Sequence, residues 1–162
     1  MNDKLDKILK LGNPKLYETS EPVKHHELQE AMEKARIMGE LVAEYRRRYG
    51  AGRAIAAPQI GYMRRMIVLN IKRPQVLINP VLEEKSPEMI ELWDDCMSFP
   101  NLLVRVNRHK SCRIRFLNEQ WQEQSWWLED DLSELLQHEY DHLNGILATQ
   151  RAVDDRSFAL NE

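Results

Sequence analysis

The chain has 162 residues, 43% of them hydrophobic and 30% charged, which is typical of one globular domain spanning residues 1–162. Its formal net charge of −3 argues against general nucleic-acid binding, and no stretch has the length or apolarity of a membrane span or a secretory leader. Two cysteines make no disulfide framework, so we expect a cytoplasmic protein with reduced thiols.

The first long element is a predicted helix from His26 to Tyr49. Its apolar residues recur at steps of three and four, which predicts one buried stripe: Leu28, Ala31, Ala35, Met38, Val42 and Tyr45. Gly50 and Gly52 follow as a stop signal. The basic cluster at 46–48 is interpreted as a solvated helix face.

The middle of the chain predicts strands. Residues 66–70 and 75–82 are rich in β-branched side chains and are flanked by proline and asparagine. Residues 112–129 predict two further strands around a turn near Asn118 and Glu119.

Helical spacing returns in residues 129–145. The predicted buried side consists of Leu132, Leu135, Leu136 and Leu143, and Gly145 is the predicted stop. Asp131 and Glu134 have the spacing of a capping box. A helix, then mostly strands, then a helix predicts an α+β fold, with mixed or antiparallel strands packed around the C-terminal helix and one long N-terminal helix.

This C-terminal helix carries the strongest chemical signal in the sequence. His138 and His142 are one turn apart, so both imidazoles can reach one ion, and Glu139 projects beside them. This is the HExxH pattern, in which two histidines bind a metal and the glutamate handles protons. The alternative is a solvated helix face that carries two histidines by chance. The remaining histidines lack such a setting and are interpreted as surface residues: His25, His26 and His109.

A catalytic site of this kind needs a third protein ligand. Downstream of the motif the chain offers only Asp154, Asp155 and the last residue, Glu162. Upstream, Cys96 lies in a polar, loop-like segment where a metal could stabilise its thiolate, although a free cysteine is more often a small buried hydrophobic residue. Cys112 lies within a predicted strand and is interpreted as such a buried residue.

Three segments together resemble the peptide deformylase family: "RAIAAPQIG" at 53–61, "DDCMS" at 94–98 and "QHEYDH" at 137–142. The family carries its motifs in this order, as Gly-x-Gly-Leu-Ala-Ala-Pro-Gln, Glu-Gly-Cys-Leu-Ser and Gln-His-Glu-x-Asp-His. The likeness covers most of the chain, and residues 5–23 look like the family's N-terminal strand and turn. The family's long C-terminal helix is missing.

The resemblance implies a metal hydrolase. Cys96, His138 and His142 would hold one divalent ion per chain, which is Fe²⁺ in many members and Zn²⁺, Ni²⁺ or Co²⁺ in others. The ion would convert its bound water to hydroxide, which attacks the formyl carbon of an N-terminal formyl-methionine. Glu139 would carry the proton to the leaving amine.

The resemblance also implies how substrate is held. The side-chain amide of Gln59 and the backbone N–H of Met97 would stabilise the oxyanion. The nascent peptide, met near the ribosome, would lie extended along a strand edge. The implied substrate-binding residues are Gly52, Arg53, Ala54, Ile55, Asp94 and Glu134. We expect a monomer or weak oligomer with no nucleic-acid or membrane partner.

Several residues depart from the family's pattern. Ala54 and Ile55 replace glycine and leucine in the first motif, and Arg53 lies where an apolar residue usually faces the methionine side chain. Asp94, Asp95 and Met97 replace glutamate, glycine and leucine in the second motif. Asp131 and Glu134 lie where the family often has apolar pocket residues. Either the capping box needs these acids, or Arg53 and Glu134 make the pocket polar, so that formyl-methionine is no longer preferred.

Three functions are therefore weighed. The favoured one is a peptide deformylase; the second is a related amidohydrolase that acts on another N-formyl or N-acyl substrate. The third is a non-catalytic descendant that binds a metal or peptide, against which the retention of Glu139 and Gln59 argues. A thermolysin-like peptidase is disfavoured because its downstream ligand is hard to supply here.

Overall fold

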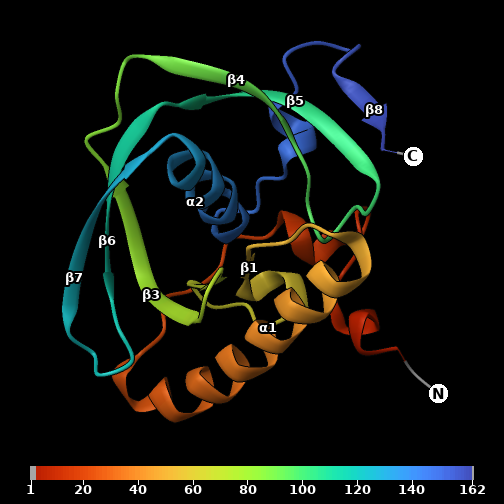
Figure 1. Ribbon diagram of the computed structural model, residues 1–162. Coiled ribbons are helices and arrows are strands. Elements are labelled where there is room, and N and C mark those ends of the chain that lie inside the picture. Colours follow the sequence, from red (N-terminus) through yellow and green to blue (C-terminus); the bar gives the residue numbers. More distant parts are fainter. Residues whose placement is uncertain (1–2, 162) are drawn as a thin grey trace.

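The computed structural model describes residues 3–161, which form two antiparallel sheets arranged around one helix (Figure 1). One sheet has the order β1-β2-β3-β6-β7, from β1 (Ala54–Ala56), β2 (Met66–Asn70), β3 (Pro74–Glu83), β6 (Ser111–Leu117) and β7 (Glu123–Glu129). The other has the order β4-β5-β8, from β4 (Met89–Asp94), β5 (Leu102–His109) and β8 (Phe158–Leu160). This arrangement confirms the predicted α+β class.

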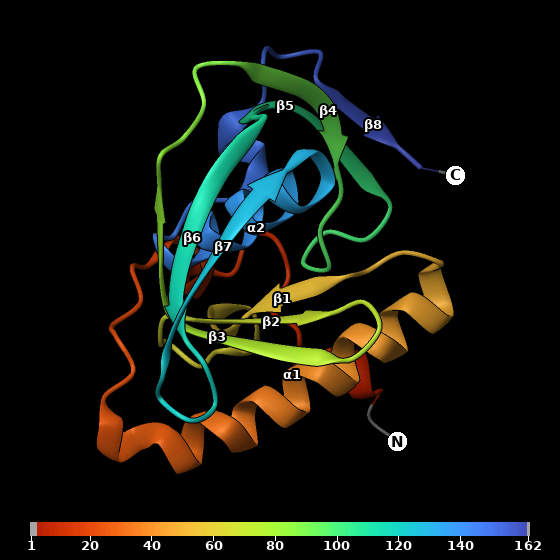
Figure 2. The same cartoon turned by 60° about the vertical axis from the view of Figure 1, so that its left-hand side comes forward.

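Helix α1 (Leu28–Tyr49) runs beneath β1, β2 and β3 (Figure 2). The predicted stripe is buried except for Leu28, which is only partly covered, and it packs against Ile55, Met66 and Val68. The helix ends where Gly50 adopts a left-handed conformation. Burial of this stripe fixes the position of β1, an edge strand of its sheet, along the candidate site.

Helix α2 (Asp130–Leu143) lies inside the curve formed by the two sheets (Figure 1). Leu135, Leu136 and Leu143 join the core, as predicted. The prediction for Leu132 was wrong: it is 37% exposed, because the buried face of α2 begins only at Ser133.

The predicted capping box was also wrong. The helix begins after Glu129, which makes no side-chain cap, and the carboxylate of Glu134 bonds to Arg53 instead of to the helix terminus.

The N-terminal segment forms two 3-10 helices instead of a strand. These are η1 (Lys4–Lys7) and η2 (Pro14–Tyr17). Further 3-10 helices are η3 (His25–Glu27), η4 (Ala57–Ile60) and η5 (Ala148–Arg151). No helix within residues 3–161 is long and apolar enough to cross a membrane.

The turn after α2 depends on Gly145. Its φ is +70°, and a Cβ there would lie 2.5 Å from the backbone oxygen of Tyr17. Gly145→Ala should therefore lower the free energy of unfolding by about 2–4 kcal/mol, measured by chemical denaturation. Gly50→Ala is the matched control, because φ is +69° there but no atom lies within 4 Å of the added Cβ. Equal losses in both variants would contradict the steric explanation.

Candidate metal centre and active site

Cys96, His138 and His142 form one buried cluster of metal-binding side chains. The loop between β4 and β5 supplies the cysteine, and α2 supplies both histidines. One ligand atom from each residue lies within 4.8 Å of the other two, and Cys96 Sγ is 3.4 Å from His142 Nε2. Among residues 3–161 the upstream cysteine, not a downstream acid, thus completes the group, and Glu162 lies outside the described residues. Asp154 instead pairs with Arg105.

This cluster fits a divalent metal ion. A thiolate and two imidazoles are ligands that zinc and iron accept, and three protein ligands leave room for a water or a substrate atom. His138 Nδ1 lies 2.9 Å from Asp94 Oδ2, which leaves the Nε2 of that ring for the ion. His142 Nδ1 is not part of the cluster, and it is buried without a hydrogen-bond partner among residues 3–161.

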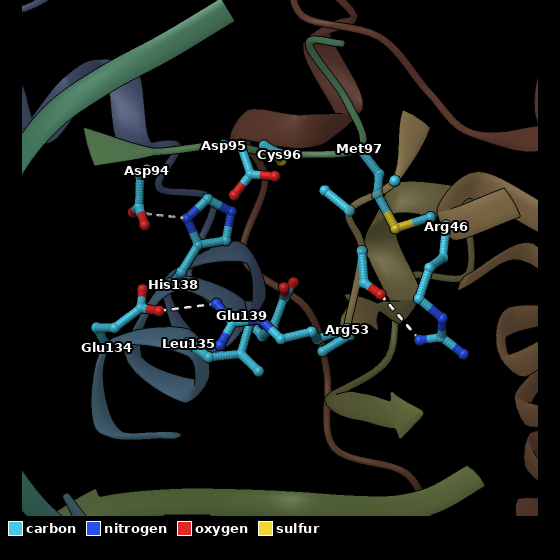
Figure 3. Close-up of a pocket in the computed structure, with 14 residues that line it drawn as sticks. Arg46, Arg53, Asp94, Asp95, Cys96, Met97, Glu134, Leu135, His138 and Glu139 are labelled. Atoms are coloured by element: carbon cyan, nitrogen blue, oxygen red, sulfur yellow. Dashed lines mark hydrogen bonds and ion pairs between the residues drawn. The ribbon is translucent and has the colours of Figure 1, made fainter. Parts of the chain in front are cut away.

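Asp94 orients His138 and is itself held by Arg108. Burial opposes ionisation of Asp94, but His138 and Arg108 outweigh it and bring the pKa of this carboxyl well below its usual value. The carboxylate is therefore the acceptor of the His138 Nδ1–H bond (Figure 3). Arg108 donates to Asp94 at 2.8 Å and to Asp141 at 2.7 Å. Asp94 lines the pocket, as a predicted substrate-binding residue would, but its Oδ2 is used within the protein.

The roles of Arg108 and Asp141 were not predicted from the sequence. Asp141 lies within the "QHEYDH" segment, so its position next to His142 was the available signal. Arg151 from η5 also donates to Asp141, at 2.5 Å. Nothing in the local pattern around Arg108 indicates that this side chain, only 3% exposed, is buried behind the metal-binding cluster.

Glu139 has the properties of a proton-transfer group. Its side chain is buried beside the cluster, and Oε1 has no hydrogen-bond partner within the described residues. Burial raises the pKa of Glu139 to about 7, with His138 acting in the opposite direction. A carboxyl with this pKa exchanges a proton readily near neutral pH.

The two predicted oxyanion donors lie next to Cys96. Gln59, on η4, accepts from the Ala56 N–H at 2.9 Å, and its Nε2 donates to Ser98 Oγ at 3.0 Å and lies 3.5 Å from Cys96 Sγ. The backbone N–H of Met97 has no acceptor among residues 3–161. Gln59 Nε2 is therefore near the candidate ligand Cys96, and Met97 follows that cysteine directly in the chain.

A cavity of about 390 Å³ opens beside the cluster (Figure 3). Of the predicted substrate-binding residues, Gly52, Arg53, Ala54, Asp94 and Glu134 line it. Ile55 does not, because its side chain is fully buried in the core against α1.

Arg46 also lines the cavity, which the sequence did not indicate. It donates to the backbone oxygens of Gly52 at 3.0 Å and Asn70 at 2.6 Å, whereas Arg47 and Arg48 bond to Glu44. The solvated-face interpretation thus holds for two of the three arginines, and Arg46 fixes the backbone that enters β1.

Arg53 and Glu134 form an ion pair at the wall of this cavity. Arg53 Nη2 is 2.8 Å from Glu134 Oε1. Burial raises the pKa of Glu134 to about 7 in spite of the opposing effect of Arg53.

The other histidines and the second cysteine lie away from the cluster. His25 and His26 are exposed, His109 is half-buried, and Cys112 is buried in β6.

The model of the polypeptide deformylase family matches residues 5–157. The chain belongs to that family. A peptide deformylase of Leptospira biflexa serovar Patoc is 33% identical to this deformylase family member, over 96% of this chain and 92% of the relative. The assignment makes the chain a metal-dependent hydrolase that removes N-formyl groups from nascent peptides.

Solved deformylase structures are similar over most of their length. The crystal structure from Thermotoga maritima is 30% identical, with a TM-score of 0.83, and the match covers 91% of this chain and 97% of that one. A structure from Acinetobacter baumannii with Met-Ala-Ser bound is 27% identical, with a TM-score of 0.81 and coverage of 89% and 96%. The expected fold and enzyme class are thereby confirmed.

Proposed function

We propose that this chain removes the formyl group from the N-terminal formyl-methionine of nascent peptides at the Cys96, His138 and His142 cluster. The observation that carries the proposal is that these three ligands converge within 4.8 Å beside the buried carboxyl of Glu139. The residues come from distant parts of the chain, so we also propose that 1–162 works as one domain. Its proposed setting is the cytoplasm, at the ribosome, as a monomer or weak oligomer.

The three ligands would hold one divalent ion. Iron(II), zinc, nickel and cobalt all accept a Cys/His₂ set, and we favour iron(II), as in many family members. When bound, the ion supplies Lewis acidity, which acidifies water and polarises the formyl oxygen. Asp94 acts as a positioning residue, because its bond to His138 Nδ1 fixes the orientation of that ring.

Glu139 would move the proton. Its free Oε1 accepts a proton from the attacking water, and the same carboxyl then donates it to the amine that leaves when the C–N bond breaks. The products are formate and a peptide with a free N-terminus. The raised pKa of Glu139, about 7, suits both directions of this transfer.

The remaining groups would bind substrate. The Met97 N–H and one N–H of Gln59 would donate to the oxyanion, the latter by turning from Cys96 Sγ. The peptide would lie along the outer edge of β1, from Gly52 to Ile55, because β1 pairs only with β2 in its sheet. Met-Ala-Ser bound to the Acinetobacter baumannii relative supports a peptide ligand.

The proposal is tested by formate release from formyl-Met-Ala-Ser, using metal-loaded protein prepared without oxygen. We expect turnover that a chelator abolishes and that added divalent metal restores, because the ligands hold the ion that the reaction needs. A folded protein with one bound ion per chain that released no formate would refute the proposal.

A further inference from the structure

The cavity beside the metal-binding cluster places an ion pair where a substrate side chain would lie. Cys96, His138 and Glu139 line this cavity, and so do Arg53 and Glu134 (Figure 3). The formyl carbon must sit at the cluster to react. The side chain of the formylated residue is only two bonds beyond the amide nitrogen, so it enters this cavity and meets the pair.

Two of the other charged residues that line the cavity are used within the protein. Asp94 is already bonded to His138 and Arg108, and Arg46 is bonded to two backbone oxygens. Arg53 uses only its Nη2 among the described residues, so its other N–H groups are available to a ligand. Its side chain is 38% exposed, whereas that of Glu134 is 9% exposed.

An apolar side chain is a poor partner for such a pair. Covering Arg53 and Glu134 with methylenes and a thioether removes water from both charges and returns no hydrogen bond, which costs free energy. A primary amide matches the pair better, because its oxygen accepts from Arg53 while its NH₂ donates to Glu134. Glutamine carries this amide on a side chain as long as that of methionine.

We propose that Arg53 and Glu134 select the first side chain of the substrate. The site accepts N-formyl peptides that begin with an amide side chain of glutamine's length at least as well as it accepts formyl-methionine. This inference rests on the proposed deformylase function and specifies the chemical class of the first residue of the substrate.

The test compares kcat/KM for formyl-Gln-Ala-Ser and formyl-Met-Ala-Ser with metal-loaded protein. The glutamine-to-methionine ratio should be one or higher in the wild type. It should fall about tenfold or more in Arg53→Ile/Glu134→Ile, because an apolar pocket leaves the amide without partners. The charge-swapped variant Arg53→Glu/Glu134→Arg should restore much of the ratio, and it keeps the test valid if the apolar variant folds poorly.

Glu27→Ile/Arg64→Ile is the matched control. It removes an Arg–Glu pair of similar exposure, 33% and 15%, that does not line the cavity, so it should leave the ratio unchanged. Calorimetric binding of the product peptides Gln-Ala-Ser and Met-Ala-Ser gives a second readout: in Arg53→Ile/Glu134→Ile the Kd of Gln-Ala-Ser should rise relative to that of Met-Ala-Ser.

Two results would overturn the inference alone. One is a wild-type ratio below one, and the other is a ratio that survives in the apolar variant. If neither peptide released formate while the metal stayed bound, that result would instead refute the deformylase function on which the inference rests.

Discussion

Glu139→Ala is expected to lower kcat for formate release by about 10²–10⁴-fold while one divalent ion per chain stays bound. The carboxyl is buried next to the metal ligands but is not one of them, and its pKa of about 7 suits a group that accepts and returns a proton. Formate release and metal content, measured on the same preparation, test both halves of this expectation. Glu139→Gln should lose activity to a similar extent, because it keeps the volume but cannot carry the proton.

The same substitution separates a catalytic role from a structural one. Glu139 Oε1 is buried without a partner among residues 3–161, so removal of this carboxyl should leave the free energy of unfolding unchanged or raise it. A variant that lost stability along with activity would indicate that Glu139 holds α2 in place. Activity within threefold of wild type would contradict the proton-transfer role.

Periodic patterns explain which parts of the fold the sequence predicted. Helix α1 follows from one apolar stripe, and β2 and β3 follow from β-branched runs, because each pattern lies within a single element. Strand β5 was missed for a physical reason. Its inward positions include Val104, Val106 and Arg108, and a buried arginine breaks the expected alternation.

The candidate site divides in the same way. The spacing of His138, Glu139 and His142 is local to one helix and could be predicted directly. Cys96 is 46 positions from His142, so its polar, loop-like setting made it only a candidate, and the resemblance to deformylases was needed to favour it as a ligand.

Arg53 and Glu134 are 81 positions apart, and no local pattern pairs them. The capping-box interpretation of Glu134 competed with the pocket interpretation; in the structure Glu134 lines the cavity and makes no cap, and the changed substrate preference stays a prediction. A tertiary contact with Arg53 replaces the local one at the helix terminus.

Asp94→Ala is expected to lower the free energy of unfolding by about 3–5 kcal/mol, because it removes one partner from a buried ion pair. Arg108 is 3% exposed and would keep only Asp141 to balance its charge. Its Nε already has no partner within residues 3–161, so the loss of Asp94 would leave a second N–H group of this buried side chain unpaired. Because the pKa of Asp94 is lowered in the folded chain, its stabilising contribution is fully present above about pH 4 and is lost as pH falls through the folded-state pKa. Chemical denaturation at pH 7 therefore measures the whole effect.

The metal affinity of Asp94→Ala should also fall, by about 10–100-fold, because His138 loses the acceptor that fixes its ring. Competition with a chelator measures this loss on protein that is still folded. Asp94→Asn tests which property matters, since it keeps an acceptor for His138 Nδ1–H but removes the charge that balances Arg108. It should therefore retain more metal affinity than Asp94→Ala.

Asp154→Ala is the matched control, because it removes a half-exposed partner of Arg105 and should lower the free energy of unfolding by at most about 1 kcal/mol. If Asp94→Ala behaved like that control in both measurements, the buried Arg108 would have to be solvated by another route, and the orientation of His138 would not depend on Asp94.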